Sequence, residues 1–266
     1  MDLPNIETYL HLDDIQTLSN WGADYAWLAG GTWLFSEPQP HLKVLIDIQT
    51  LGWSEIEVNE DYLIIGATCP LIKLLEYSWL AEWTAVEGLK SAVAALAASL
   101  KVINVATIGG NICLALSVGT LAPIMVALGA NYEIWNIKGE SHQVAAKDFQ
   151  IGSRQTILQP GEILRRVLIP LSHLQWKVNY QRFSIAATDP ALAIVVTAKN
   201  EQQINCVISA SIAAPFLSEF NDVETLNFAF LQKLNFITDA KASAEYRREI
   251  TAVLIKRTLE ELKIKN

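Results

Sequence analysis

One long stretch without charge, from Val102 to Tyr132, constrains the fold more than any other feature of the sequence. A helix crosses a bilayer with about 20 predominantly apolar residues, so length alone would allow a membrane span. However, Gly109, Gly110 and Asn111 lie near its centre, and lipid-exposed chain cannot satisfy the backbone groups of such a turn. The stretch is therefore predicted to be buried chain that leads into and out of a polar turn, and no membrane span is expected.

A buried segment of this length needs a large core, and the composition provides one. Hydrophobic residues make up 51% and charged residues 18% of the 266 residues, a length that suits two domains. The net charge of −8 argues against nucleic acid as the main partner, because phosphate binding needs a concentrated basic surface. The three cysteines, Cys69, Cys113 and Cys206, are widely separated and form no disulfide framework, metal motif or iron–sulfur motif. Together with a start that lacks the order of a signal peptide, they predict a reducing, cytoplasmic compartment.

Hydrophobic periodicity predicts an α/β first part followed by antiparallel strands. Helices are expected at residues 10–20, 71–77, 79–100, 121–128 and 242–264, and strands at 25–29, 44–47, 62–67, 131–136, 163–169, 178–183, 191–198 and 206–213. The character of the chain changes near Pro170, so a domain boundary is predicted between residues 170 and 178.

Two glycine pairs are the candidates for ligand binding. They are Gly30 and Gly31, followed by Thr32, and Gly109 and Gly110, flanked by Thr107 and Asn111. Glycine accepts positive φ at little steric cost, so successive N–H groups can point into one concavity and bind an anion such as a pyrophosphate. A single Gly-Gly turn is common structural punctuation, but two such turns set in apolar chain indicate a dinucleotide held between subdomains. Neither turn reads GxGxxG and no P-loop occurs, so the fold is expected to differ from a Rossmann fold.

The order of these motifs resembles the FAD-binding subunit of the xanthine dehydrogenase and carbon monoxide dehydrogenase family. The resemblance is carried by Leu28-Ala29-Gly30-Gly31-Thr32, Leu45-Ile46-Asp47-Ile48, Ile65-Gly66-Ala67-Thr68, Asn104-Val105-Ala106-Thr107-Ile108-Gly109-Gly110-Asn111-Ile112, Ala127-Leu128-Gly129-Ala130, Pro160-Gly161-Glu162-Ile163-Leu164, Tyr180-Gln181-Arg182-Phe183 and Ser243-Ala244-Glu245-Tyr246-Arg247-Arg248. These blocks cover nearly the whole chain.

The resemblance implies an α+β protein with a PCMH-type FAD-binding domain over residues 1–172, built from two α/β subdomains (about 1–57 and 58–172). A smaller α+β domain of antiparallel strands and helices is expected over residues 173–266. FAD is the implied cofactor, and no metal site is expected. The residues to which the resemblance assigns cofactor binding are Ala29, Gly30, Gly31, Thr32, Trp33, Thr107, Ile108, Gly109, Gly110, Asn111, Thr120 and Tyr180.

The sequence departs from the family pattern at several of these positions. Trp33 stands where relatives often have Asp, and Ile103 stands where many have Arg. Relatives usually carry an Asp that helps to hold the cofactor near the position of Thr120. Loss of that charge-assisted hydrogen bond is worth roughly 1.5–3 kcal/mol.

The function that the resemblance implies is electron transfer within a molybdenum-containing hydroxylase. Such a chain takes electrons from iron–sulfur clusters and passes them to NAD, oxygen or another acceptor. The expected partners are a molybdopterin-containing large subunit and a small subunit with two [2Fe–2S] clusters. A flavin-free family member that acts as a partner-binding module remains the alternative, and a stand-alone flavin oxidoreductase of the vanillyl-alcohol-oxidase type is disfavoured by the short C-terminal part. No His, Cys or Ser arrangement suggests a nucleophile.

Overall fold

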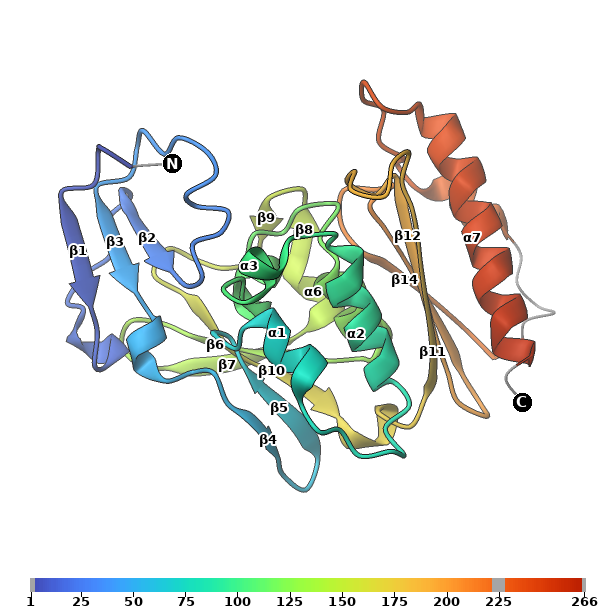
Figure 1. The fold of residues 1–266 in the computed structure, drawn as a ribbon, viewed down its shortest axis with the longest axis horizontal. Coiled ribbons are helices and arrows are strands. Elements are labelled where there is room, and N and C mark those ends of the chain that lie inside the picture. Colours follow the sequence, from blue (N-terminus) through green and yellow to red (C-terminus); the bar gives the residue numbers. More distant parts are fainter. Residues whose placement is uncertain (1–2, 222–227, 265–266) are drawn as a thin grey trace.

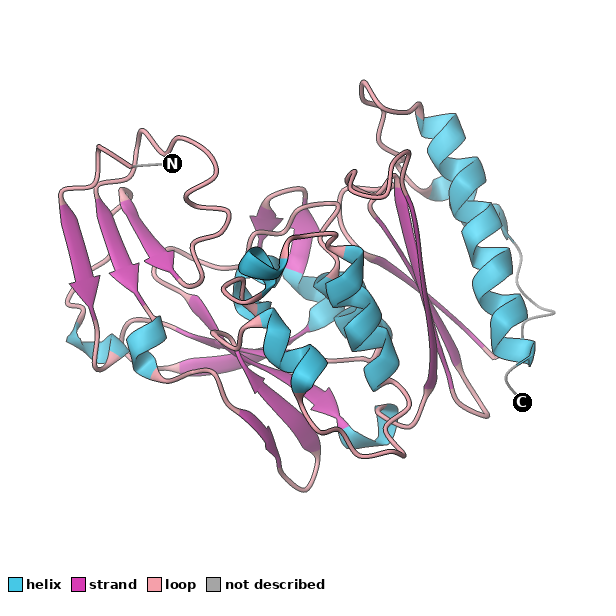
Figure 2. Ribbon diagram, in the orientation of Figure 1, coloured by secondary structure: helices cyan, strands magenta, loops and turns pink. Residues whose placement is uncertain are grey.

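The computed structural model describes residues 3–221 and 228–264, without the side chains of the last two. Three units follow one another along the chain from left to right in Figure 1, and helices and strands contribute to each of the larger two (Figure 2). In the described ranges, no helix is both long and apolar enough to cross a membrane.

The N-terminal unit is a three-stranded parallel sheet in the order β1-β3-β2, formed by β1 (Thr8–His11), β3 (Val44–Asp47) and β2 (Tyr25–Leu28). Short 3-10 turns, η1 (Ile15–Thr17) and η2 (Gln49–Leu51), follow β1 and β3. The helix expected at residues 10–20 is therefore wrong. Tyr9 and His11 lie on one face of β1, with their rings 4.7 Å apart, while Leu12 is buried. The segment is an alternating edge strand that is too short for its period to be distinguished from a helix.

The central unit contains a five-stranded antiparallel sheet in the order β4-β5-β10-β6-β7. Its strands are β4 (Ile56–Val58), β5 (Tyr62–Gly66), β10 (Ile163–Pro170), β6 (Asn131–Trp135) and β7 (Ser141–Ala145). The helices of the unit are α1 (Leu71–Glu76), α2 (Val86–Ala95), α3 (Leu100–Ile103), α4 (Ile108–Cys113), α5 (Leu121–Ala127) and α6 (Ala146–Phe149). A small hairpin, β8 (Gln150–Gly152) and β9 (Gln155–Thr156), and the 3-10 turn η3 (Leu171–His173) complete it.

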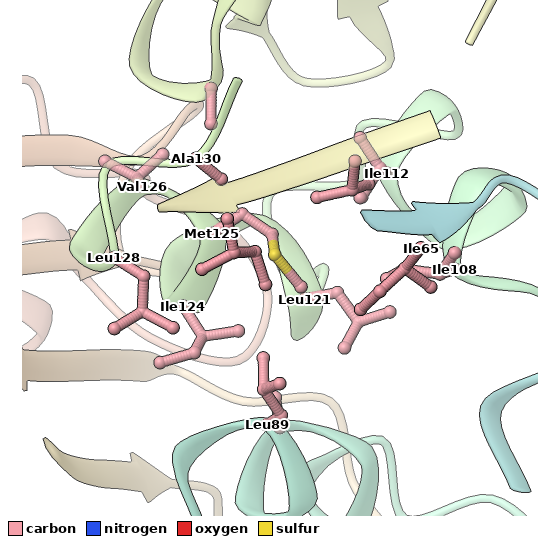
Figure 3. Close-up of a cluster of buried hydrophobic side chains, with 14 of the residues drawn as sticks. Ile65, Leu89, Ile108, Ile112, Leu121, Ile124, Met125, Val126, Leu128 and Ala130 are labelled. Atoms are coloured by element: carbon pink, nitrogen blue, oxygen red, sulfur yellow. The ribbon is translucent and has the colours of Figure 1, made fainter. Parts of the chain in front are cut away.

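The single helix expected over residues 79–100 is divided in the structure. The helix α2 begins at Val86 and ends at Ala95, because Ala97 takes a left-handed conformation with φ 51°. A left-handed residue ends a helix in the way that a C-terminal glycine commonly does. The uncharged stretch forms α4, α5 and the chain around them, and all seven residues of α5 are buried. Figure 3 shows Leu121, Ile124 and Met125 packed among other core side chains. The prediction of buried chain is confirmed.

The C-terminal unit is a four-stranded antiparallel sheet with one long helix. The strands β11 (Lys177–Phe183), β12 (Ala193–Lys199), β13 (Ile204–Ser209) and β14 (Phe216–Phe220) pair in chain order. The helix α7 (Ala244–Ile264) covers one face, as expected from the sequence, and η5 (Phe228–Lys233) lies beside it.

This C-terminal sheet is buried on both faces, so it forms a middle layer (Figure 1). Ile194 and Val196 of β12 pack with the core of the central unit, where α5 contacts β12 and α2 contacts β11. Ala193 and Val195, which alternate with them, pack against α7. Because successive strand residues point to opposite faces, a continuous apolar run is the pattern that such a middle strand requires. The core is thus continuous across the expected boundary near residue 172.

Candidate functional site

The first glycine turn, which we call loop 1 (residues 29–37), follows β2. Gly31 adopts φ 66°, and the Phe35 N–H donates to the Gly31 carbonyl at 2.9 Å. Gln49 holds the start of the loop, because its Nε2 donates to the Ala29 carbonyl at 2.7 Å. A Cβ atom added to Gly30 would lie 1.9 Å from the carbonyl oxygen of Val105. Loop 1 is therefore in direct backbone contact with the segment that precedes the second glycine turn, and only glycine allows that approach.

Loop 1 presents backbone donors that the protein does not use. No group in the described ranges 3–221 and 228–264 accepts a hydrogen bond from the N–H of Gly30, Gly31 or Thr32. These three residues are partly or largely accessible. Consecutive free N–H groups in a turn with a left-handed glycine are the construction that binds anions in proteins.

The second glycine turn is built differently, because its donors are already used. Thr107 caps α4, and its Oγ1 accepts from the Gly110 N–H at 3.0 Å. The Ile108 N–H donates to the Cys69 carbonyl at 3.0 Å, and the Gly109 N–H donates to the Ala67 carbonyl at 2.9 Å. The Ile108 side chain is fully buried and packs near Ile65 in the core (Figure 3). The two turns are adjacent, as expected, but they are not equivalent. Loop 1 has free N–H groups, whereas the N–H groups of Ile108, Gly109 and Gly110 are bonded within the protein.

A cavity of about 160 Å³ lies between the chain after α4 and the chain between β11 and β12. It is lined by Ala95, Leu96, Asn111, Leu114, Leu116, Val118, Gly119, Thr120, Arg182, Thr188, Asp189, Pro190 and Ala191. Two of the site residues expected from the sequence, Asn111 and Thr120, therefore meet here. Asn111 also orders the wall, because its Oδ1 accepts from the Leu121 N–H at 3.3 Å.

Two buried polar atoms from residues that line this cavity have no partner in the described part of the chain: the Thr120 hydroxyl and the Arg182 Nε. The remaining Arg182 donors are occupied, because Nη1 donates to the Ala187 carbonyl at 3.0 Å and Nη2 donates to the Asp189 carbonyl. A buried polar group without a hydrogen bond is costly, so these two atoms mark a place where a polar ligand would find partners.

Tyr180 lies behind the cavity wall rather than on it. Its hydroxyl donates to the Thr120 carbonyl at 2.9 Å, and burial raises the pKa of the phenol far above its ordinary value. Tyr180 therefore stays neutral and fixes the backbone of Thr120. Its contribution to a site is positional.

Backbone strain gathers around the same cavity. Four residues other than glycine have positive φ in the described part of the chain: Ala97, Ala115, Arg154 and Ala210. Ala97 follows cavity-lining Leu96, and Ala115 lies between two lining residues. The Arg154 N–H donates to the Ala115 carbonyl at 2.7 Å, and the Ala210 N–H donates to the Ser117 carbonyl at 2.9 Å. Strained residues of this kind are characteristic of functional sites. Here two adjoin lining residues in the chain, and the other two are hydrogen-bonded to residues that lie between lining residues.

Trp33 joins loop 1 to the β8–β9 hairpin. The Arg154 guanidinium lies 5.5 Å from the centre of the Trp33 ring, and its Nη2 lies 3.4 Å from the Glu37 carboxylate. The Trp33 Nε1 is buried and has no hydrogen-bond partner among residues 3–221 and 228–264. The family resemblance assigned Trp33 to the site, but nothing in the sequence pointed to Arg154, because this contact joins residues that are far apart in the chain. Arg182 stands within the quoted Tyr-Gln-Arg-Phe block, yet only the structure shows it at the cavity.

None of the four histidines lies in a catalytic arrangement or lines the cavity. The His173 Nδ1 lies 2.8 Å from the Leu128 carbonyl, and His11 and His142 lie 3.9 Å from carboxylates at the surface. Among the described residues, no group of three His, Cys, Asp or Glu side chains is placed to hold a metal ion.

Comparison with known proteins relates this geometry to one family of domains. Residues 8–172 match the model for the FAD binding domain in molybdopterin dehydrogenase. The carbon monoxide dehydrogenase medium chain of Afipia carboxidovorans is 25% identical over 94% of this chain and 93% of its own. Xanthine dehydrogenase from Oryza sativa is 41% identical over 73 residues, which are 27% of this chain and 5% of that protein. The chain thus spans only a small part of the first plant relatives it matches.

Solved structures show the same fold. A chain of the Cu,Mo-CO dehydrogenase superposes with a TM-score of 0.87 at 22% identity and covers 100% of both chains. A chain of quinoline 2-oxidoreductase from Pseudomonas putida 86 superposes with a TM-score of 0.81 at 22% identity and covers 98% of each. The fold expected from the sequence, α+β with a smaller C-terminal unit of antiparallel strands and helix, is confirmed.

Proposed function

The chain belongs to the family of FAD-binding domains in molybdopterin dehydrogenases, and we propose that it is the FAD-binding electron-transfer subunit of a molybdenum-containing hydroxylase or dehydrogenase. FAD is its cofactor. When bound, FAD supplies the redox chemistry by accepting two electrons and releasing them to an acceptor.

The observation that carries this proposal is the set of free backbone donors in loop 1, together with the cavity, to whose wall loop 1 is linked through Arg154 and Ala115. The free N–H groups of Gly30, Gly31 and Thr32 suit the diphosphate of FAD, because successive backbone donors in a turn bind phosphate oxygens. The unpartnered Thr120 hydroxyl and Arg182 Nε suit a polar ligand edge, and most other lining residues are apolar. The residues present therefore fit a molecule with an anionic linker and a largely apolar ring system.

In this proposal the protein binds and positions the cofactor and takes no proton from the substrate. Loop 1 holds the diphosphate through its backbone. Leu96, Leu114 and Val118 exclude water from the cavity. Tyr180 and Asn111 keep the cavity wall in place through their hydrogen bonds to Thr120 and Leu121. The same proposal includes contacts between the cofactor and the second glycine turn. The residues expected there are Thr107, Ile108, Gly109 and Gly110.

The names of similar proteins support the proposed partners. This chain is similar to a carbon monoxide dehydrogenase medium chain and to the nicotine 6-hydroxylase medium subunit of Paenarthrobacter nicotinovorans. We infer a complex in which a large subunit holds molybdopterin and a small subunit holds two [2Fe–2S] clusters. The described residues of this chain offer no metal site, so the clusters belong to another polypeptide. The terminal acceptor in this proposal is NAD, oxygen or another oxidant.

A flavin-free, partner-binding module is the second candidate, and two observations favour it. The donors of Ile108, Gly109 and Gly110 are satisfied within the protein. The cavity of about 160 Å³ is also smaller than the roughly 300–1,000 Å³ of ordinary cofactor pockets. FAD binding therefore requires an adjustment of the loops, whereas a structural module requires none.

Visible absorption of the purified chain, recorded after incubation with FAD and desalting, separates the two candidates. Retained flavin absorption supports the proposal. The same measurement on the complex with its co-expressed large and small subunits covers the case in which the partners complete the site. If neither preparation retains flavin, the electron-transfer proposal is rejected and the module is favoured.

A further inference from the structure

Arg154 is a cation that the structure places against loop 1, and the proposed function does not use it. Its side chain reaches Trp33 and Glu37 of loop 1. Its backbone N–H donates to Ala115, in the chain after the second glycine turn. The β8–β9 hairpin therefore touches both glycine-bearing segments through one residue.

The conformation of this residue is costly, which indicates that its position matters. Arg154 has φ 58° and its hydrogen-bond partner Ala115 has φ 49°. Left-handed backbone is unfavourable for an ordinary L-residue, because Cβ approaches the following carbonyl oxygen. A glycine at position 154 would avoid this cost, as Gly139 with φ 80° does in the neighbouring β6–β7 hairpin. The strained arginine instead directs a guanidinium toward loop 1.

The environment of the guanidinium is incomplete in a way that suits an anion. Its ion pair with Glu37 joins two side chains that are each about half exposed, at 54% and 45%. Exposed pairs of this kind contribute little to stability. An arginine offers five donors in a fork that matches phosphate geometry, and among the described residues the guanidinium donates a single hydrogen bond, of 3.4 Å to Glu37. A diphosphate on loop 1, which carries two negative charges, would therefore compete effectively with one carboxylate.

We propose that Arg154 is the cationic partner of a diphosphate bound on the free N–H groups of loop 1, and that Glu37 holds the guanidinium in place until the diphosphate displaces it. The inference rests on the proposed function when the diphosphate is that of FAD. A separate nucleoside diphosphate would present the same chemistry to the same groups. In either case Arg154 recognises the diphosphate rather than the flavin ring.

The experiment compares FAD, riboflavin and ADP as ligands of the full chain. FAD and riboflavin binding are followed by flavin fluorescence, and ADP binding is followed by calorimetry. The variants are Arg154→Gln, Arg154→Lys, Glu37→Gln and, as a matched control, Lys138→Gln in the β6–β7 hairpin. Far-UV circular dichroism establishes that each variant is folded.

The expected result is that wild-type protein binds FAD more tightly than riboflavin. Arg154→Gln should weaken FAD roughly ten- to hundredfold, the range for a lost charge-assisted hydrogen bond, and should leave riboflavin unchanged. Arg154→Lys should recover part of the loss, Glu37→Gln should bind FAD at least as tightly as wild type, and Lys138→Gln should change nothing.

Two outcomes overturn the inference without touching the proposed function: equal wild-type affinity for FAD and riboflavin, or an equal loss of both flavins in Arg154→Gln. If neither flavin binds to the full chain or to its complex with the co-expressed subunits, the proposed function fails and ADP decides the inference separately. ADP that binds to wild type and binds at least tenfold more weakly to Arg154→Gln supports a nucleotide site. Absence of ADP binding as well refutes the role of Arg154.

Discussion

Gly30→Ala tests the contact between the two glycine-bearing segments. The added Cβ would lie 1.9 Å from the Val105 carbonyl oxygen and 2.8 Å from its carbonyl carbon, whereas ordinary contacts begin near 3.4 Å. Both atoms belong to the backbone, so the clash cannot be relieved by a side-chain rotation. Overpacking of this kind costs typically 1–3 kcal/mol. We expect the substitution to lower the free energy of unfolding by about 2 kcal/mol or to push loop 1 away from Val105.

The assay is urea unfolding followed by circular dichroism, together with retention of FAD after desalting. Gly52→Asn is the matched control, because Gly52 has φ 70° with no atom within 4 Å of an added Cβ, and asparagine tolerates left-handed backbone. The control should unfold within about 0.5 kcal/mol of wild type, the usual range for a surface substitution, and should bind FAD normally. A Gly30→Ala protein that equals the control in both measurements would refute the argument that loop 1 packs on the Val105 backbone.

Three further substitutions test other contacts. Thr120→Val should stabilise the protein without FAD by up to about 1 kcal/mol, because it removes a buried hydroxyl that has no partner, and should weaken FAD binding; calorimetry with and without FAD measures both. Arg165→Met should destabilise by roughly 3 kcal/mol, because Glu55 loses its 2.6 Å ion-pair partner in a largely buried site. Thermal unfolding of the double variant with Glu55→Gln should recover most of that loss, and a double variant as unstable as the single one argues against the ion pair. The hydrogen bond from Arg247 is the chief cause that lowers the pKa of Asp239 from 3.8. The contribution of this carboxylate to the free energy of unfolding is therefore present above pH 3.8 and is lost as the pH falls through the lower pKa of the folded state. The stability difference between wild type and Asp239→Asn, followed by urea unfolding against pH, should shrink in that acidic range and stay constant above it.

The family and the fold could be predicted from the sequence, because the motifs are local and keep their order along the chain. Residues 242–264 were expected to be helical, and α7 runs from Ala244 to Ile264, since a long amphipathic pattern is the most reliable signal in a sequence. The helix predicted at residues 10–20 was wrong because the apolar residues there are few and the strand is short. The prediction of one helix over residues 79–100 failed because nothing in an alanine-rich run marks Ala97 as left-handed.

The candidate site could be predicted only in part, for a related reason. Glycine pairs indicate turns without any further information, so loop 1 and the second glycine turn could be predicted. That the donors of the second turn are used by Ala67, Cys69 and Thr107 is a tertiary fact, and no local pattern contains it. The same holds for Arg154, which meets loop 1 across more than a hundred residues of chain.

The middle-layer position of the C-terminal sheet has a consequence for how the site can open. A hinge between that sheet and the central unit would have to part Ile194 and Val196 from a large shared core, and well-packed cores do not deform gradually. The N-terminal sheet is attached more lightly, through one small apolar cluster that includes Trp135 and Ile163 of the central unit and through polar contacts such as the one from Trp27 Nε1 to the Glu162 carbonyl at 3.1 Å. We therefore expect the N-terminal unit with loop 1 to tilt more readily than the C-terminal sheet when a bulky ligand binds.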